Sequence, residues 1–376
     1  MMDDSSIIVL KVGTSTLMDG QRVNLRNIAA LVEAAATIRR LGRRVVIVTS
    51  GAVGFGCVKL DLCSRPTSLS LKQACAAAGQ SQLVRLYEDL FTTVNLKVAQ
   101  ILLCRSDFSN KDRFANFIAA MSELLALGVV PIINENDTVS VSEIRFGDND
   151  TLSALVAVSL AADKLVLLTD VDCLYTADPR TDPHAKELPE ISPSELHALR
   201  VGEEVGGTKW GTGGMATKIV AARTAVCAGI ETLLVNGTNP ERVVEYLMSG
   251  KLKGSVFKTD SGKVCMSTMT DKRRWILGLP VKGVVHVDEG AALAIGKKKS
   301  LFAAGVIKVQ GRFLPGESVK LYRGDTEIAR AIVTLNSDDL DKIKGRSSDE
   351  YQDILGYSGE PEIAFRTDII LSGQLA

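Results

Sequence analysis

The sequence predicts an α/β protein with a mostly parallel sheet sandwiched by helices, followed by a small mixed β domain. Four repeats of apolar strand, polar loop and amphipathic helix fill about the first 170 residues, and such repeats form right-handed crossover units with helices on both faces of a sheet. Past Gly254 the pattern changes to short strands separated by glycines. Because 376 residues exceed a usual single core, we expect two domains, residues 1–258 and 273–376, joined by a linker over 259–272.

Apolar runs of strand length alternate with stretches of helical periodicity through the first domain. Runs rich in β-branched residues give the expected strands: residues 6–12, 44–49, 98–103, 129–133, 164–169 and 231–236. Apolar residues spaced three and four apart give the expected helices: residues 25–41, 70–94, 112–127, 151–162 and 219–228. Asn24 can cap the first of these helices, and Gly42 can stop it. The second is rich in small residues, so we expect it to pack closely against the sheet or a second subunit.

The second domain is expected to be a small mixed β structure of about 100 residues. Its short strands begin with residues 274–279 and 283–287 and end near Ile370. Its charges nearly balance, and its one concentrated basic run, Lys297 to Lys299, is best explained as a solvated turn. This domain therefore gives no strong indication of an anionic partner.

Composition argues against several classes of protein. The 44 Lys and Arg residues balance 44 Asp and Glu residues, so no net field attracts the molecule to nucleic acid or to an anionic membrane. Seven cysteines without a C-x-x-C pair argue against a disulfide framework and a zinc site, and the three histidines form no metal motif. The N-terminal sequence fits neither a signal nor a transit peptide, and no apolar run approaches membrane-spanning length. We therefore expect a reducing, cytoplasmic compartment.

The polar residues best suited to chemistry surround the end of the strand predicted over 129–133. The cluster from Asn134 to Asp137 follows that strand directly, and a second cluster, Gly147 to Asp150, precedes a helix. Ligands bind at the carboxyl ends of strands in open α/β sheets, so we expect a polar binding site here. Asp148 or Asn149 could instead serve only as a helix cap.

Two lysines occupy positions that suit a bound phosphate. Lys11 lies near the carboxyl end of a buried strand, where a charge is costly without a partner, so a phosphate contact is favoured over a snorkelling side chain. Lys218 follows a glycine-rich loop that opens a helix, and the positive end of a helix attracts phosphate and repels an unpaired cation. The glycine-rich loop from Ser50 to Gly56 is either a flexible crossover or a cradle for a carboxylate or phosphate.

These features together suggest phosphoryl transfer from a nucleotide to a small polar acceptor. Such a transfer needs alignment and charge stabilisation far more than covalent chemistry from the protein. Two lysines can supply the charge, and an acidic residue between them can hold both in place. A carboxylate acceptor is already ionised at neutral pH, so no histidine base is needed.

Six strings in order along the chain resemble the amino-acid kinase superfamily, and their combination is similar to the glutamate 5-kinase family in particular. They are KVGTS at Lys11, IVTSGAV at Ile47, PIINENDTV at Pro131, GDNDTLSALVA at Gly147, LLTDVDCLYTADPR at Leu167 and GTGGMATK at Gly211. In the second domain VDEGAALAI, SLFAAGVIKVQGRF and LGY resemble the PUA-type appendage that many of those enzymes carry. The resemblance covers nearly the whole chain, and it implies ATP-dependent phosphorylation of the γ-carboxylate of L-glutamate to L-glutamyl 5-phosphate, the first step of proline biosynthesis.

The resemblance also implies roles for the matching residues. Lys11 and Lys218 are expected to stabilise the transferred phosphoryl group, with Asp150 organising them. The glutamate-binding residues are expected to be Ser50, Gly51, Asn134, Asp137 and Asn149, and Asp137 would pair with the substrate ammonium group. The ATP-binding residues are expected to be Lys11, Thr169, Asp170, Thr212, Gly213, Gly214, Met215, Ala216, Thr217 and Lys218.

Cofactors and partners follow from the same resemblance. Mg²⁺ is expected to ride on the ATP rather than in a metal site of the protein. Proline is expected to act as a feedback inhibitor, the chain to form a dimer or tetramer, and a separate glutamyl-phosphate reductase to consume the product. We expect no membrane partner, and the balanced charge argues against nucleic acid as a partner. Two departures from the family pattern stand out: the basic, bulky loop from Gly206 to Trp210, and Arg330-Ala331 where the appendage typically has glycine.

Two alternatives to this function remain at the level of sequence. A related kinase for N-acetylglutamate, aspartate, carbamate or a nucleoside monophosphate would share the lysines and the fold. A free ammonium group needs an anion such as Asp137, whereas an acetylated or phosphorylated acceptor would be repelled by one. An RNA-binding regulatory protein is suggested by the PUA-like domain. The near-neutral charge of the chain speaks against it, because affinity for a phosphate backbone depends on concentrated Lys and Arg.

Overall fold

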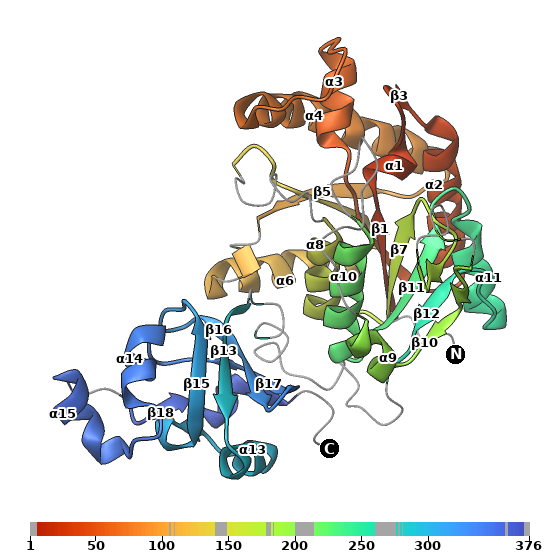
Figure 1. The fold of residues 1–376 in the computed structure, drawn as a ribbon. Helices are drawn as coiled ribbons and strands as arrows, with labels where there is room; N and C mark the ends of the chain where they lie inside the picture. The colour runs from red at the N-terminus through yellow and green to blue at the C-terminus, as the bar shows by residue number, and fades with distance from the viewer. Residues whose placement is uncertain are drawn as a thin grey trace. The chain divides into compact units, whose positions relative to one another are not determined.

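The computed structural model of the chain describes residues 6–104, 107–108, 110–139, 149–177, 182, 184–199, 214–259, 276, 279, 281–357 and 360–371. Two compact units are present (Figure 1). The first holds nearly all described residues up to Thr259, and the second holds the described residues from Ile276 on. Among the helices that the structure describes, none is both long and apolar enough to cross a membrane.

An eight-stranded sheet forms the centre of the first unit, in the order β10-β12-β11-β7-β1-β4-β6-β5. Its strands are β1 (Ile7–Val12), β4 (Arg44–Val48), β5 (Val98–Leu103), β6 (Val130–Glu135), β7 (Lys164–Thr169), β10 (Glu190–Ile191), β11 (Glu231–Asn236) and β12 (Ser255–Phe257). Every neighbouring pair is parallel except β11 and β12. The predicted mostly parallel sheet is confirmed, and β1 lies in its interior between β7 and β4.

Helices connect the strands and cover the sheet (Figure 1). They are α1 (Thr14–Leu17), α2 (Leu25–Arg40), α3 (Ala52–Lys59), α4 (Leu69–Thr93), α6 (Lys111–Ala126), α8 (Asn149–Ser159), α9 (Pro193–Ala198), α10 (Met215–Cys227) and α11 (Glu241–Ser249). Two short hairpins complete the unit, β2 (Met18–Asp19) with β3 (Arg22–Val23) and β8 (Leu174–Tyr175) with β9 (Glu187–Leu188). Asn24 caps α2 as predicted, since its side chain accepts a hydrogen bond from the backbone N–H of Asn27.

Alternation of side chains along β1 sends its apolar residues and its lysine to opposite faces of the sheet. Ile8, Leu10 and Val12 belong to the main core, together with apolar residues of α2, α4 and α11. Lys11 points to the other face, where α8 packs against β1 and α10 packs against α8. The strand therefore directs a buried lysine toward the two helices that carry Asp150 and Lys218.

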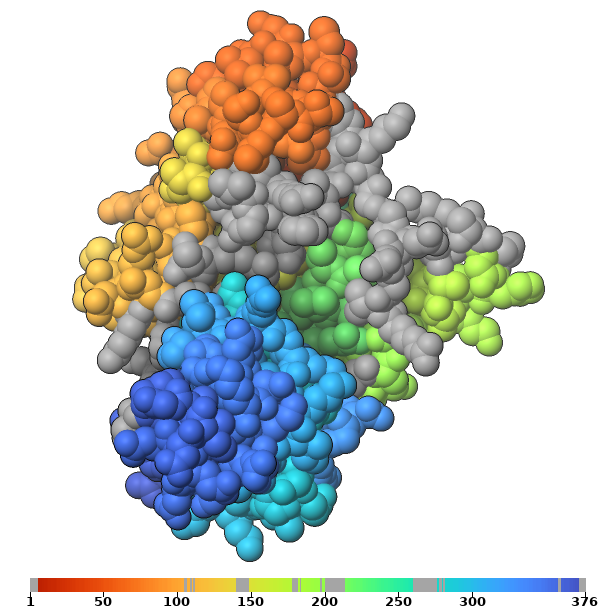
Figure 2. Space-filling view, turned by 60° about the vertical axis from the view of Figure 1, so that its left-hand side comes forward, coloured from red at the N-terminus to blue at the C-terminus, as the bar shows by residue number. Residues whose placement is uncertain are grey.

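Helices α3 and α4 pack backbone to backbone, and they form one contiguous cluster in orange in Figure 2. A Cβ atom at Gly79 would lie 2.0 Å from the carbonyl oxygen of Ala52, and one at Gly56 would lie 1.8 Å from that of Cys75. Gly79 and Cys75 of α4 thus meet α3 rather than the sheet, while the contact of this helix with a second subunit stays a prediction. The segment after Ser50, predicted to be a loop, instead forms the helix α3.

The second unit contains the predicted small mixed sheet, in the order β15-β13-β16-β17-β19. Its strands are β13 (Val281–Val287), β15 (Val306–Gly311), β16 (Ser318–Arg323), β17 (Thr326–Ile332) and β19 (Ile369–Leu371), and only the β13–β16 pair is parallel. A short pair, β14 (Leu301–Phe302) with β18 (Glu362–Ala364), and the helices α13 (Glu289–Gly296), α14 (Ser337–Ile343) and α15 (Tyr351–Leu355) complete it. The prediction of a strand over residues 274–279 is wrong at Ile276, which is helical.

Candidate functional site

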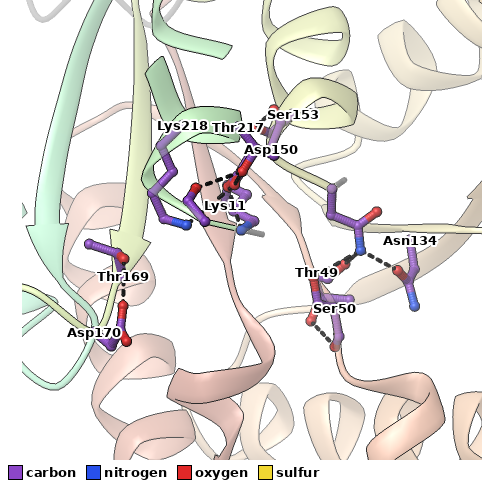
Figure 3. A network of polar contacts seen from close by, with 12 residues as sticks. Lys11, Thr49, Ser50, Asn134, Asp150, Ser153, Thr169, Asp170, Thr217 and Lys218 are labelled. Atoms are coloured by element: carbon purple, nitrogen blue, oxygen red, sulfur yellow. Dashed lines mark hydrogen bonds and ion pairs between the residues drawn. The ribbon is translucent and has the colours of Figure 1, made fainter. Parts of the chain in front are cut away.

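Lys11 and Lys218, which are 207 positions apart in sequence, converge on the carboxylate of Asp150 (Figure 3). Lys11 Nζ pairs with Asp150 Oδ1, and Lys218 Nζ lies 3.3 Å from Oδ2. Thr217 Oγ1 donates to the same Oδ2 over 2.7 Å. Lys11 and Lys218 are only 5% and 6% exposed, and Asp150 is 1% exposed. The cluster therefore holds two cations and one anion away from water.

The protonation state of Asp150 follows from its surroundings. Burial by itself raises the pKa of a carboxyl group, but the positive charges of Lys11 and Lys218 and the hydrogen bonds donated by Lys11 and Thr217 lower the pKa of Asp150 to about 2. The group is therefore ionised at neutral pH and fixes both lysines. An excess of one positive charge remains in a region of low dielectric, where it can stabilise an anion strongly.

Local structure explains how each member of this cluster is placed. Asp150 is the second residue of α8, and the positive end of a helix favours an acidic residue there. Ser153 supports that turn, because its hydroxyl donates to the Asp150 carbonyl over 2.6 Å. Gly214 is the N-cap of α10, which places Thr217 and Lys218 in its first turn.

A network of amides lies beside the lysine cluster, at the carboxyl ends of β4 and β6. Asn149 Nδ2 lies 2.8 Å from the Thr49 carbonyl oxygen, 2.9 Å from Ser50 Oγ and 3.1 Å from Asn134 Oδ1. Asn134, which is 1% exposed, donates from Nδ2 to Gln80 Oε1 over 2.8 Å. The two polar clusters predicted around the strand 129–133 therefore do meet. Asn149 is the first residue of α8 and links them to Ser50.

The turn after β4 needs the glycine that follows Ser50. Gly51 has φ +102° and is the N-cap of α3, a conformation that other residues adopt only with strain. Thr49 anchors this turn from inside the core, where its hydroxyl lies 3.0 Å from the buried Tyr87 hydroxyl. The turn thereby holds the Ser50 hydroxyl toward the amide network.

Asp137 lies just past β6 in an environment that disfavours its charge. Burial raises the pKa of Asp137 to about 6, and the positive charge of Arg65 opposes this rise. Asp137 is therefore about half ionised near pH 6 and carries most of its negative charge at neutral pH. Neither Arg65 nor Gln80, which contacts Asn134, was among the predicted site residues, because neither belongs to a motif that would indicate it.

Two further residues predicted to bind the nucleotide, Thr169 and Asp170, lie at the end of β7, on the side of β1 away from β4 and β6. Thr169 ends β7, is 4% exposed, and its hydroxyl lies 3.1 Å from Asp170 Oδ1 (Figure 3). Its carbonyl accepts a hydrogen bond from the backbone N–H of Gly237 over 2.7 Å. Gly214, Met215 and Ala216 form the start of α10. Thr212, Gly213 and the loop from Gly206 to Trp210 lie outside the described residues.

Within the part of the chain that the structure describes, no group of three or more His, Cys, Asp or Glu side chains is arranged to hold a metal ion. The carboxylate of Asp150 is engaged by Lys11 and Lys218. In the second unit, Arg330, the residue that departs from the expected pattern, pairs with Glu327 over 3.3 Å. It therefore contributes to an ion pair within β17.

Comparison with known proteins gives a consistent result over nearly the whole chain. The model of the amino acid kinase family matches residues 6–236, and the model of the PUA domain matches residues 283–355. Glutamate 5-kinase of Nostoc punctiforme is 46% identical over 370 residues, which are 97% of this chain and 99% of that protein. Glutamate 5-kinase of Rippkaea orientalis is 45% identical over 371 residues, with the same coverage of 97% and 99%. The solved structure of a carbamate kinase from Giardia lamblia bound to AMP-PNP superposes with a TM-score of 0.49 at 16% identity and covers 68% of this chain and 99% of that one.

Proposed function

The chain belongs to the amino acid kinase family and, within it, to the glutamate 5-kinases, and we propose that the Lys11–Asp150–Lys218 cluster is where it phosphorylates L-glutamate. The enzyme transfers the γ-phosphoryl group of ATP to the γ-carboxylate of glutamate, which gives L-glutamyl 5-phosphate in the first step of proline biosynthesis. The observation that carries the proposed site is the convergence of two buried lysines on one ionised carboxylate.

The transferred phosphoryl group passes through a loose transition state with its negative charge spread over three oxygens. Lys11 and Lys218 neutralise that charge, and Asp150 keeps both ammonium groups in place before the substrates arrive. Asp150 does not act as a base. The attacking γ-carboxylate is already ionised at neutral pH, so the reaction needs no proton acceptor.

The amide network binds the acceptor. Ser50, Asn134 and Asn149 supply polar contacts at the ends of β4 and β6, and Gly51 supplies backbone in the same turn. Asp137 pairs with the α-ammonium group of glutamate, and that pairing favours the ionised form of the carboxyl group. An N-acetylated acid lacks this cation and offers Asp137 no positive charge in place of the ammonium group, so it is a poor substrate.

The nucleotide lies on the opposite side of Lys11, against Thr169, Asp170 and the segment from Thr212 to Lys218. The amides at the start of α10 and the positive end of that helix suit its phosphates. Mg²⁺ would be held by ATP rather than by the protein, because its ordinary ligands are phosphate oxygens and water and the buried carboxylate of Asp150 is paired with two lysines. When bound, the ion neutralises charge on the leaving phosphates.

Regulation and cellular context extend the same proposal. Proline carries the amino and carboxyl groups that the glutamate pocket recognises, so it competes for that pocket as a feedback inhibitor. The chain works as a homo-oligomer in the cytoplasm, and a separate glutamyl-phosphate reductase consumes the labile product. Residues 1–258 form the catalytic domain, 259–272 a linker, and 273–376 the PUA-like domain. An RNA-binding role is not favoured, because the full-length relatives are named as kinases.

Hydroxylamine trapping tests the proposed site and substrate directly, because hydroxylamine converts an acyl phosphate into a stable hydroxamate. With ATP and Mg²⁺, we expect hydroxamate from L-glutamate, little from L-aspartate or N-acetyl-L-glutamate, and less from glutamate when proline is added. Lys218→Met should abolish the signal. Equal yields from all three acids, or an active Lys218→Met variant, would remove the basis for this assignment.

A further inference from the structure

The hydrogen-bond network at the ends of β4 and β6 fixes which way its side-chain amides point. The backbone N–H of Glu135 donates to Asn134 Oδ1 over 2.9 Å, and a backbone N–H can only donate. The oxygen of Asn134 is therefore oriented toward Glu135, and its Nδ2 must face Gln80. Gln80 accepts that bond through Oε1, which leaves Gln80 Nε2 as a donor at the far side of the same amide.

The same reasoning fixes Asn149. Its Nδ2 faces the carbonyl oxygen of Thr49, and a carbonyl can only accept. The Oδ1 atom of Asn149 must therefore point the other way, as an acceptor. Both orientations thus follow from backbone groups whose roles as donor or acceptor cannot be exchanged.

Two side-chain atoms of this network, one donor and one acceptor, have no hydrogen-bond partner within the part of the chain that the structure describes. Among the described residues, Gln80 Nε2 and Asn149 Oδ1 are buried and have no hydrogen-bond partner. Burying an amide atom without a partner is unfavourable, so such atoms usually mark a bound molecule or water. One is a donor and the other an acceptor, and both side chains contact Asn134. A zwitterionic amino acid offers both a carboxylate that accepts and an ammonium group that donates.

The position of Gln80 in the network indicates which carboxylate of the acceptor it meets. The γ-carboxylate must lie near Lys11 and Asp150, where phosphoryl transfer takes place. In Figure 3, Asn134 lies on the side of Ser50 away from Lys11, and Gln80 bonds to Asn134. Gln80 is therefore at the end of the network that the amino-acid end of the substrate reaches.

A rigid element holds Gln80 there. It follows Gly79, whose backbone is pressed against the start of α3 at Ala52. It lies within the 25-residue helix α4, so its backbone cannot shift without moving that contact. The close crossing of α3 and α4 thus couples the position of Gln80 to that of Ser50 and Gly51.

We propose that Gln80 is a specificity-determining residue whose Nε2 donates to the α-carboxylate of glutamate, while Asn149 Oδ1 accepts from the α-ammonium group. This inference rests on the proposed function. It predicts that the enzyme distinguishes glutamate from its α-amide through Gln80. The α-amide keeps the γ-carboxylate and the ammonium group but presents a neutral group to Gln80.

A pair of matched variants tests the proposal. Gln80→Glu keeps an oxygen to accept from Asn134 but replaces the donor with a negative charge. Gln73→Glu makes the same change two turns earlier on α4 and serves as the control. For Gln80→Glu we expect kcat/KM for glutamate to fall about 100-fold. This is the size of effect expected when a hydrogen bond to the charged α-carboxylate is lost and a repelling negative charge takes its place. The KM for ATP should stay within about 2-fold, and Gln73→Glu should match the wild type.

The substrate analogue separates recognition from a merely structural effect. The preference for glutamate over its α-amide, as a ratio of kcat/KM values, should fall at least about 10-fold in Gln80→Glu and stay unchanged in Gln73→Glu. An unchanged ratio, or equal rises in KM for glutamate and ATP, would overturn the role of Gln80. If Gln80→Glu does not fold, Gln80→Met must show the same loss of preference. A wild-type enzyme that makes no hydroxamate from glutamate would instead refute the proposed function.

Discussion

Replacing Asp150 by asparagine should leave a folded but weakened and inactive protein. The substitution keeps the size of the side chain and an oxygen for Thr217, but it removes the charge between Lys11 and Lys218. Two ammonium groups then face each other in a region that is almost closed to water. The variant should therefore lose both the stability of the cluster and the arrangement that transfer requires.

The magnitude follows from the pKa of Asp150. A fall from its ordinary value of 3.8 to about 2 favours the ionised folded state by roughly 2 kcal/mol. Because the folded pKa is the lower one, this stabilisation is complete above about pH 4 and is lost as the pH falls toward 2. Unpairing a buried cation raises the cost to roughly 3 to 5 kcal/mol. In a unit of this size, that range lowers the melting temperature by roughly 5 to 15 °C.

Thermal unfolding at pH 7 and low salt, together with the hydroxamate assay, checks this prediction. Lys218→Met is the matched control, since it leaves one lysine paired with Asp150 and should lower stability far less while still abolishing activity. The double variant Asp150→Asn/Lys218→Met should recover part of the lost stability, because it removes the repulsion. If Asp150→Asn melts within about 1 °C of the wild type, or if Lys218→Met is equally destabilising, the cluster is not held together as described.

Other predictions concern the acceptor pocket and its support. Because burial raises the pKa of Asp137 to about 6, kcat/KM for glutamate should fall as the pH drops below about 6, and Arg65→Ala should move that fall to higher pH by removing the opposing charge. Asp137→Asn should raise the KM for glutamate at least about 100-fold and leave the KM for ATP unchanged. The same substitution should raise the melting temperature at pH 8, because it removes a negative charge that burial disfavours. A lower melting temperature would contradict this. Gly79→Ala should destabilise by roughly 1 to 3 kcal/mol or more and weaken glutamate binding, because its Cβ would collide with the Ala52 carbonyl. Gly296→Ala, at a helical site with open space around it, should be neutral or slightly stabilising in the same melting experiment.

The sequence predicted six of the eight strands in the sheet of the first domain, since buried parallel strands appear as uninterrupted apolar runs, and it missed the short strands β10 and β12. The strands over 98–103, 164–169 and 231–236 have the predicted bounds. Helix α3 was missed because its segment, AVGFGCVK, contains two glycines, which disfavour a helix in isolation. Close packing against α4 outweighs that preference.

The candidate site was only partly predictable from local pattern. A lysine in an apolar strand already indicates a special role for Lys11, and the strand-end polar clusters mark Asn134 and Asn149. Gln80 carries no such signal, because its role depends on where the crossing of α3 and α4 places it. The influence of Arg65 on Asp137 likewise comes from an approach in space that the sequence does not show.

The place of β1 in the sheet has a consequence for how this enzyme can evolve. Strand β1 separates β4 and β6, whose ends supply the groups proposed for the acid, from β7 and β11 on the flank proposed for the nucleotide. Substitutions after β4 or β6 can therefore change which acid is accepted without disturbing how the phosphoryl donor is held. Selection can thus change the preference for the acid and the binding of the phosphoryl donor independently. Lys11 lies between the two regions and must remain suitable for every pairing of acid and donor.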